Sequence, residues 1–210
     1  DAVKKIFELK QRPIFNPLIV HIGSIDDLDK IAKNIPDVAW KLAEAFWPGP
    51  LTLLLEKKDI IPDIVTAGSE RVAVRIPNHK LTLDLLSKLT FPVAAPSANP
   101  FMSISPTKAI HVMNYFEGKL KFILEGGNCE KGIESTIIGF EDKDAVIYRS
   151  GSCDVVEIEK IVGKLILPKQ KTLNPQAPGM LKRHYAPKTR FIVTTNYKKE
   201  MQKHANKKIG

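Results

Sequence analysis

Polar side chains that could bind an anion gather in a few short segments of this 210-residue chain. The first is a basic stretch, Lys10 to Pro13, which contains Arg12 and is followed by the amide of Asn16 and the imidazole of His21. A guanidinium binds phosphate or carboxylate through two parallel hydrogen bonds, and an ammonium supplies a point charge. The alternatives are a solvated basic loop and a core histidine whose hydrogen bonds are met inside the fold.

A second candidate is Arg75, which lies in the otherwise apolar segment 73–76. A buried guanidinium is costly unless it meets an anion. We therefore expect Arg75 to face either a carboxylate of the protein itself or the anionic group of a substrate.

The segment 93–100 changes abruptly from small apolar residues to Pro-Ser-Ala-Asn-Pro. This pattern predicts a buried strand that ends in a restricted backbone and presents Ser97 and Asn99. Ligands of open α/β sheets bind beyond the carboxyl ends of strands, so this strand end is a candidate binding wall. Ser105, next to Pro106, could either cap the following helix or contact a phosphate at its first turn.

Two further candidates adjoin glycine turns. Glu134 and Ser135 follow Gly132 at the entrance to an apolar run, and Arg149 ends another run just before Gly151. The sequence contains no Walker-type phosphate loop, dinucleotide fingerprint, zinc-ligand spacing or nucleophile elbow. We assign none of these residues as a nucleophile.

An alternation of strands and helices must position these residues. Hydrophobic patterning predicts strands over 18–20, 51–55, 71–76, 93–95, 121–124, 135–140 and 145–148. It predicts helices over 2–10, 79–89, 107–116 and 154–163, and a short helix capped by Ser24. One more helix should begin at Pro36 and bury Val38, Leu42, Ala45 and Phe46. The fold class is therefore mixed α/β over 1–163.

Charge and proline content divide the chain further. The net charge is +9, and from residue 164 onward ten Lys and two Arg face one acid, Glu200. The proline-rich stretch 164–189 is typical of an interdomain linker, and 190–210, with a strand-like run at 191–194, of the start of a second α/β domain. The chain begins without Met on a helical pattern, so we expect a longer protein.

Composition also limits the cellular setting. The two cysteines, Cys129 and Cys153, have neither a disulfide framework nor metal-ligand spacing, which predicts a reducing cytoplasm and no metal site built from protein ligands. No apolar run approaches the length needed to span a bilayer, so no membrane contact is expected. The basic tail could contact nucleic acid, and the alternative is a solvated linker.

In order and spacing, these motifs resemble the YrdC-like family of threonylcarbamoyl-AMP synthases, specifically its longer, two-domain members. The matching segments are 10–13 with 16–21, 47–52, 73–77, 95–99, 132–137, 149–151 and the linker stretch 177–188. The resemblance implies a mixed twisted sheet with flanking helices, a linker and the start of a second α/β domain. It also implies synthesis of threonylcarbamoyl-adenylate and pyrophosphate from L-threonine, bicarbonate and ATP, for modification of the adenosine next to the tRNA anticodon.

The same resemblance implies roles for individual residues. ATP would be bound by Lys10, Arg12, Asn16, Ser97, Asn99, Ser105, Arg149, His184 and Tyr185, the last two closing over the site from the linker. Threonine would be bound by His21, Arg75, Ala95 and Ser135, with Arg75 pairing its carboxylate. Mg²⁺ would be held through the ATP phosphates. The product would pass to a tRNA threonylcarbamoyl-transferase complex, and a weak contact with tRNA fits the basic tail.

The chain departs from the family pattern at two points. The opening Thr-rich motif that ends in Tyr-Gly-Leu is absent, so we expect one wall of the site to lie before Asp1. Gln11 replaces the usual glycine between the Lys and the Arg, where glycine would permit backbone conformations that glutamine disfavours.

Two other functions compete with this interpretation. A carbamoyltransferase module of hydrogenase maturation shares the fold, but it predicts zinc-finger cysteines and an acylphosphatase region elsewhere in the protein. A non-catalytic module that binds double-stranded RNA or tRNA would use a basic concave surface. Residues 1–163 carry 20 basic and 22 acidic side chains, which argues against the RNA-binding alternative.

Overall fold

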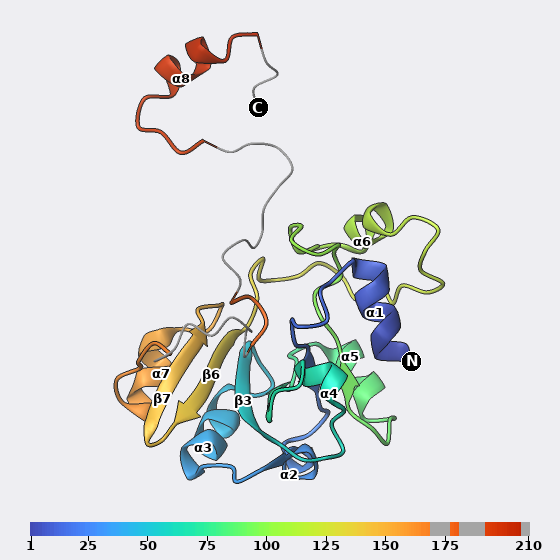
Figure 1. The fold of residues 1–210 in the computed structure, drawn as a ribbon, viewed down its shortest axis with the longest axis vertical. Helices are drawn as coiled ribbons and strands as arrows, with labels where there is room; N and C mark the ends of the chain where they lie inside the picture. The colour runs from blue at the N-terminus through green and yellow to red at the C-terminus, as the bar shows by residue number, and fades with distance from the viewer. Residues whose placement is uncertain (169–176, 181–191, 207–210) are drawn as a thin grey trace.

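The computed structural model describes residues 1–168, 177–180 and 192–206, and a mixed β-sheet forms its centre (Figure 1). The strands are β1 (Ile19–His21), β2 (Ala32–Lys33), β3 (Leu51–Lys57), β4 (Arg71–Arg75), β5 (Val93–Ala94), β6 (Thr136–Glu141) and β7 (Asp144–Arg149). Their order is β5-β1-β4-β3-β6-β7, with β2 paired to β3. The pairs β1–β4 and β3–β6 are parallel and the others antiparallel. The predicted mixed α/β fold is confirmed.

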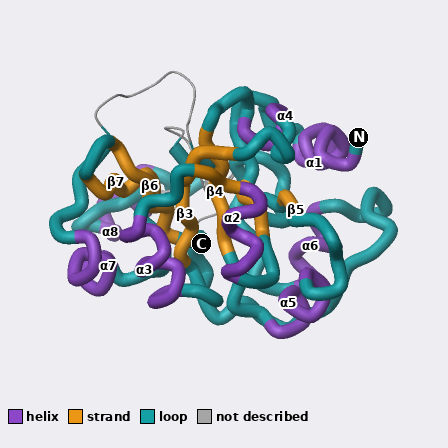
Figure 2. The backbone as a smooth tube through the Cα atoms, turned by 90° about the horizontal axis from the view of Figure 1, so that it is seen from below, coloured by secondary structure: helices purple, strands orange, loops and turns teal. Residues whose placement is uncertain are grey.

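Helices accompany this sheet, and all but the last along the chain lie around it, as Figures 1 and 2 show together. They are α1 (Ala2–Lys10), α2 (Leu28–Ile31), α3 (Asp37–Phe46), α4 (Asp63–Thr66), α5 (Lys80–Leu86), α6 (Ala109–Tyr115), α7 (Val155–Val162) and α8 (Tyr197–Lys203), with a 3₁₀ turn η1 (Ile25–Asp27) before α2. In the described parts of the chain, none of them has the length and apolar character that crossing a lipid bilayer requires.

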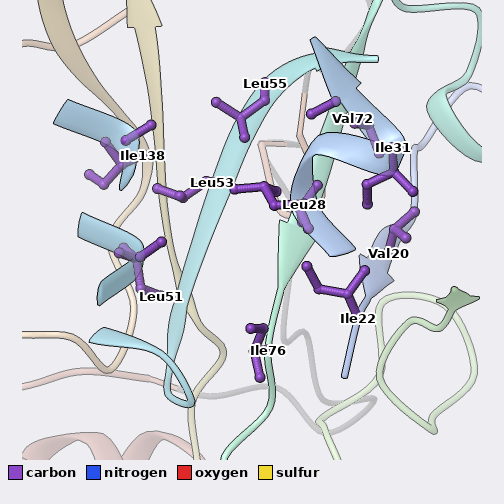
Figure 3. Packing of buried hydrophobic residues seen from close by; sticks show 14 of the residues in the cluster. Val20, Ile22, Leu28, Ile31, Leu51, Leu53, Leu55, Val72, Ile76 and Ile138 are labelled. Carbon is purple, nitrogen blue, oxygen red and sulfur yellow. The ribbon is translucent and has the colours of Figure 1, made fainter. Parts of the chain in front are cut away.

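One face of the sheet carries the main hydrophobic core. Successive side chains of a strand point to opposite faces, so alternate residues such as Val72 and Val74 share the face on which α2 and α3 pack. Figure 3 shows Leu28 and Ile31 of α2 against this face, where full burial of each large aliphatic side chain contributes about 1.5–3 kcal/mol.

Helix α3 packs on this core with two of the predicted residues, Leu42, which is buried, and Phe46, which is partly buried. It buries Ala39, Leu42 and Ala43, whereas Ala45 is exposed. Small side chains at Ala39 and Ala43 allow the helix to lie close to β3. This close approach decides which residues of α3 are buried more strongly than the spacing of its large apolar residues does.

The opposite face of the sheet holds a smaller cluster and the polar candidates. Leu54, Ala73, Ile137 and Tyr148 form this second cluster, with Ile19 packed against it. By strand alternation, His21 shares the face of Ile19, Arg75 that of Ala73, and Thr52 that of Leu54. The polar candidates therefore lie on the face opposite the main core.

Strand pairing brings several of these positions to one end of the sheet. His21 ends β1 opposite Arg75 at the end of β4. Leu51 begins β3 opposite Thr136, and Arg149 ends β7 opposite Ile137. We call this the Arg75 end of the sheet.

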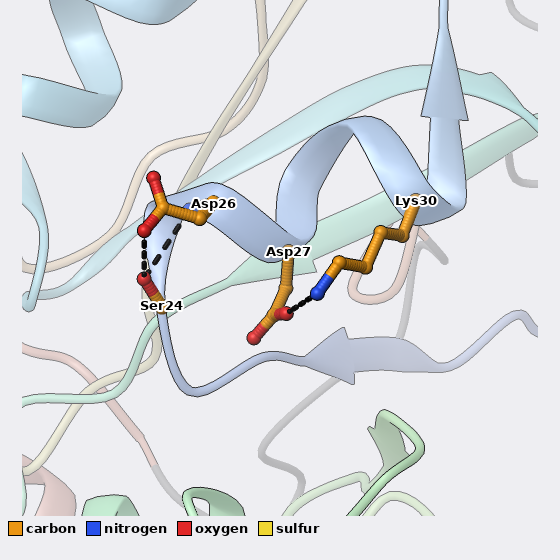
Figure 4. A network of polar contacts seen from close by, with 4 residues as sticks. All are labelled: Ser24, Asp26, Asp27 and Lys30. Carbon is orange, nitrogen blue, oxygen red and sulfur yellow. Dashed lines mark hydrogen bonds and ion pairs between the residues drawn. The ribbon is translucent and has the colours of Figure 1, made fainter.

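A capped turn leads away from β1 at the same end. Ser24 Oγ accepts a hydrogen bond from the Asp26 amide at 3.3 Å, and Lys30 Nζ lies 2.7 Å from Asp27 Oδ1 (Figure 4). The predicted Ser24 cap is confirmed. It fixes the direction in which the chain leaves His21.

The structure corrects three strand predictions. In place of a buried strand over 93–95 it has a half-buried edge strand, β5 (Val93–Ala94), because β5 has one neighbour, β1. Within the described residues, 121–124 pair with no strand and expose Phe122 and Leu124, since an apolar run becomes a strand only where a neighbouring backbone is free to pair. Residues 192–194 of the strand-like run 191–194 are also not in a strand.

Candidate active site

Two buried hydroxyls and an arginine form the best-connected part of the site. Thr52 and Ser135, which are 0% and 3% exposed, hydrogen bond through their Oγ atoms at 2.7 Å. Arg149 donates from Nε to the Ser135 carbonyl at 2.9 Å and from Nη2 to Ser135 Oγ at 2.9 Å. The structure thus brings together Ser135, predicted on the threonine side, and Arg149, predicted on the ATP side.

Within the described residues, the side chain of Arg75 makes one hydrogen bond. Its Nε donates to the Gly49 carbonyl at 2.8 Å, in the turn between α3 and β3. A guanidinium has five N–H donors, and the other four of Arg75 have no partner within the described residues. Burial lowers the pKa of Arg75, which marks a charge removed from water. Arg75 is therefore fixed at one edge and open at the other.

Arg12 is bound more tightly by its own loop. Its Nε donates to the Asn16 carbonyl at 3.1 Å, and its Nη2 donates to Asn16 Oδ1 at 2.8 Å and to the Pro17 carbonyl at 2.6 Å. Asn16, only 2% exposed, thereby orients Arg12. Gln11 precedes Arg12 in the left-handed region with φ 53°, where the chain turns out of α1.

The three arginines form an electropositive group without a carboxylate partner among the described residues. Burial and the charge of Arg149 lower the pKa of Arg12 to about 10. Burial and Arg75 lower the pKa of Arg149 to about 10, against an opposing effect of Glu134. In the described part of the chain, none of the three forms an ion pair. Such a group is suited to binding a polyanion.

Lys10 and Asn99 organise the loop that follows β5. Lys10 is 4% exposed, and its ammonium donates to the carbonyls of Ser97 and Asn99. Burial and the charge of Arg12 lower the pKa of Lys10 to about 8. The Asn99 amide in turn donates to the Ser103 carbonyl at 2.7 Å. Both side chains therefore bind backbone, and their predicted contacts with ATP stay predictions.

This loop lies at the other end of β1 from His21. Strand β5 runs antiparallel to β1, and the amide of Ala95 donates to the Ile19 carbonyl at 3.0 Å. The side chain of Ser97 is exposed here. Ser97 and Asn99 therefore follow the carboxyl end of β5, which lies at the opposite end of β1 from His21 and Arg75.

His21 is a neutral imidazole in this environment. Burial and the neighbouring Arg75 lower its pKa to about 4. Its Nδ1 is fully buried and has no hydrogen-bond partner within the described residues. A neutral ring beside a cationic group can accept or donate a hydrogen bond without adding charge.

Ser105 is engaged by Glu134, a candidate at a glycine turn to which the sequence assigned no role. Its hydroxyl donates to Glu134 Oε1 at 2.5 Å, which links the loop before α6 to the loop before β6. The hydroxyl of Thr52 was missed, and it could have been found as a lone polar group in the apolar run 51–55.

A short piece of the predicted linker reaches the site. Arg149 donates from Nη1 to the Pro178 carbonyl at 3.1 Å, and Ala177 is fully buried in the second cluster. Gly179 has φ +89°, and a Cβ there would lie 2.8 Å from Arg149 Cδ. His184 and Tyr185, predicted to close over ATP, lie outside the described residues.

The geometry suits anion recognition rather than covalent catalysis. The described residues hold no group of three or more His, Cys, Asp or Glu side chains placed for a metal ion, and Cys129 and Cys153 are free. What the site offers is guanidinium donors beside buried hydroxyls and a neutral imidazole. These groups can position a polyanion and a carboxylate side by side.

Known proteins are similar to this chain. A family model named Sua5/YciO/YrdC and described as "Telomere recombination" matches residues 1–151, and one described as "Threonylcarbamoyl-AMP synthase, C-terminal domain" matches 153–210. The threonylcarbamoyl-AMP synthase of Pyrococcus abyssi is 46% identical over 197 residues, 92% of this chain and 58% of the relative. That of Bacillus subtilis is 44% identical over 191 residues, 89% of this chain and 55% of the relative. The chain thus spans little more than half the length of these relatives.

A solved structure agrees with these sequence matches. The crystal structure of P. abyssi Sua5 complexed with L-threonine superimposes with a TM-score of 0.84 at 45% identity, over 89% of this chain and 56% of that one. The fold, the ordered motifs and the matched family model lead to one assignment. The chain belongs to the Sua5/YciO/YrdC family, over residues that include every described member of the arginine site.

Proposed function

We propose that this chain carries the adenylate-forming site of a threonylcarbamoyl-AMP synthase, which makes threonylcarbamoyl-adenylate and pyrophosphate from L-threonine, bicarbonate and ATP. The single observation that carries the proposal is the group formed by Arg12, Arg75 and Arg149, three half-buried guanidiniums without a carboxylate partner among the described residues. The names of the relatives supply the reaction.

The chemistry requires two bond-forming steps. The ammonium group of threonine loses a proton to solvent, and the resulting amine condenses with bicarbonate to give a carbamate and water. A carbamate oxygen then attacks the α-phosphorus of ATP, and the bond from that phosphorus to the β-phosphate oxygen breaks to release pyrophosphate. Neither step needs a protein nucleophile. Both need anionic reactants to be held close together despite their mutual repulsion.

The N–H donors that each arginine has left, among the described residues, suggest which substrate group it binds. Arg75, with four N–H groups unpaired among the described residues, would bind the threonine carboxylate beside His21 and Ser135. Arg12 and Arg149 retain further N–H donors after their contacts with the described part of the protein, and these would bind the phosphates. Ser97, Asn99, Ser105 and Lys10 would line or support the nucleotide side.

Mg²⁺ fits this scheme as a partner of ATP. Three guanidiniums do not bridge the phosphate oxygens as a metal ion does, and the fully buried Oε2 of Glu134, which has no partner among the described residues, is a suitable hard oxygen ligand. When bound, the ion would neutralise charge that develops on the leaving pyrophosphate.

The wider setting follows from the product. Threonylcarbamoyl-adenylate is a reactive mixed anhydride, so it would pass to a tRNA threonylcarbamoyl-transferase complex in the cytoplasm. Closure by His184 and Tyr185 would exclude water from it. A weak tRNA contact through the basic tail belongs to the same proposal.

The two rival functions are less well supported. The C-terminal family model at 153–210 favours a synthase over a carbamoyltransferase module of hydrogenase maturation, which would not require that segment. An RNA-binding module would use fully exposed cations, whereas the three arginines here are half-buried.

The decisive experiment measures pyrophosphate release by the full-length protein given ATP, threonine and bicarbonate. We expect release that requires all three substrates. Release that is unaffected by omitting threonine, or no release at all, contradicts the proposal. Salt-dependent tRNA binding without threonine-dependent release would instead indicate the RNA-binding module.

A further inference from the structure

Glu134 is the acid that accompanies the three arginines, and the described residues engage only one of its oxygens. Oε1 accepts a hydrogen bond from Ser105 at 2.5 Å. Oε2 is fully buried and has no hydrogen-bond partner within the described residues. A buried carboxylate oxygen normally has a partner, so this one calls for an explanation.

Arg149 is a charge within electrostatic range of Glu134, but its bonded donors point elsewhere. Its three bonded donors go to Ser135 and Pro178. Glu134 still acts on Arg149 electrostatically, because its charge raises the pKa of that guanidinium. The carboxylate therefore lies within electrostatic range of Arg149 without forming an ion pair with it.

The backbone around Glu134 is fixed. Its carbonyl accepts a hydrogen bond from the Ser152 amide at 2.9 Å, and a Cβ at Gly151 would lie 2.5 Å from that oxygen. Ser105 fixes the other end of the side chain. With both ends held, Oε2 is a preorganised ligand atom.

A free carboxylate oxygen beside a phosphate-binding site would repel its ligand unless a cation lies between them. Mg²⁺ meets this need, since it is bound in proteins by one or two carboxylates together with substrate phosphates and water. We propose that Glu134 Oε2 is the protein ligand of the Mg²⁺ ion that accompanies ATP. This inference rests on the proposed function, because ATP supplies the remaining ligands.

The test compares ATP affinity with and without Mg²⁺, by calorimetry on the full-length protein without threonine. In the wild type we expect Mg²⁺ to tighten ATP binding at least tenfold. In Glu134→Gln, which keeps an oxygen for Ser105 but loses the charge, this gain should fall below twofold, while metal-free ATP should bind at least as tightly. Glu130→Gln removes an exposed acid of the same loop and should behave like the wild type.

A second readout separates coordination from a general charge effect. With Mn²⁺ as the probe, water proton relaxation of the ternary complex reports the number of metal-bound waters, which should rise in Glu134→Gln as water replaces the carboxylate. Glu134→Asp, which retains the charge but withdraws it by one methylene, should also reduce the Mg²⁺ gain, and it serves if the Gln variant fails to fold.

The outcomes are distinguishable. An undiminished Mg²⁺ gain in Glu134→Gln or Glu134→Asp, or an unchanged number of metal-bound waters, overturns the role of Glu134 and leaves the proposed function standing. A wild-type protein that binds no ATP under either condition overturns both.

Discussion

At the scale of single residues, the main feature is a set of three guanidiniums. Their hydrogen bonds to the described part of the protein all go to uncharged groups. Arg12, Arg75 and Arg149 donate to carbonyls, an amide and a hydroxyl. Neutral acceptors orient a guanidinium without cancelling its charge. Each arginine is thus positioned and still available for an anion, which makes the contribution of each one separately testable.

The threonine carboxylate is the expected partner of Arg75, so Arg75→Ala should affect threonine far more than ATP. A charge-assisted hydrogen bond contributes about 1.5–3 kcal/mol, which corresponds to an increase of roughly 10- to 200-fold in the KM for threonine. The Kd for ATP should change less than threefold. Steady-state pyrophosphate release and calorimetry measure the two values, and equal losses would count against this assignment.

His21 should make the fold sensitive to acid. Its pKa is lowered to about 4 in the folded protein, from an ordinary value near 6.5, so between these pH values the unfolded chain binds a proton that the folded one does not. The free energy of unfolding therefore falls as the pH falls through this window, by about 3 kcal/mol at most. Urea unfolding of the wild type and of His21→Gln at pH 7 and 4.5 should show a smaller decrease in the variant. Parallel decreases would contradict the expectation.

At the scale of elements, the C-terminal end of α1 stores backbone strain. Gln11 adopts φ 53° and ψ 39°, a left-handed conformation that costs a residue with a Cβ about 1 kcal/mol. Gln11→Gly should therefore raise the free energy of unfolding by up to about 1 kcal/mol, whereas Gln11→Ala should leave it unchanged within about 0.5 kcal/mol. Chemical denaturation measures both, and equal values for the two variants would show that the conformation is not the cause.

The linker segment 177–180 offers a second test at this scale. Gly179→Ala places a Cβ 2.8 Å from Arg149 Cδ and should displace the Pro178 carbonyl from that arginine. Gly127→Ala is a matched control, because Gly127 has φ +90° and a Cβ added there would meet nothing within 4 Å. We expect a tenfold or larger change in ATP affinity for Gly179→Ala and less than twofold for Gly127→Ala. Similar changes would indicate that backbone strain alone is responsible.

The sequence predicted where helices and strands form better than which segments lie beside one another. Most helices and strands followed from apolar periodicity, although α4 and α8 were not predicted. Arg75 stood out because a buried guanidinium is costly, and Arg149 because it ends an apolar run just before Gly151. The edge position and direction of β5, and the absence of a strand at 121–124, depend on which backbone lies alongside, which no local pattern encodes. The inward turn of Lys10 likewise depends on carbonyls 87 and 89 residues away.

At the scale of the whole molecule, the fold holds mutually repelling charges together. An anion that binds only the folded protein should therefore stabilise it. At a pyrophosphate concentration of 100 times the Kd, the gain is about 2.7 kcal/mol, which corresponds to roughly 5–10 °C in Tm for a chain of this size. Thermal unfolding with and without pyrophosphate measures the shift, with sodium chloride at equal ionic strength as the control. An equal shift from chloride would mean that no specific site is involved.

The shortness of β1 has a consequence for how the sequence can vary. Arg12 and Asn16 precede this three-residue strand, and His21 ends it, so about 7 Å of extended backbone separates its first residue from its last. The strand thus fixes the distance between the two halves of the site. One inserted or deleted residue would change this distance and turn the imidazole toward the core. Insertions and deletions should therefore be excluded between residues 16 and 21, while the loop 117–133, which contains no strand, has no such constraint.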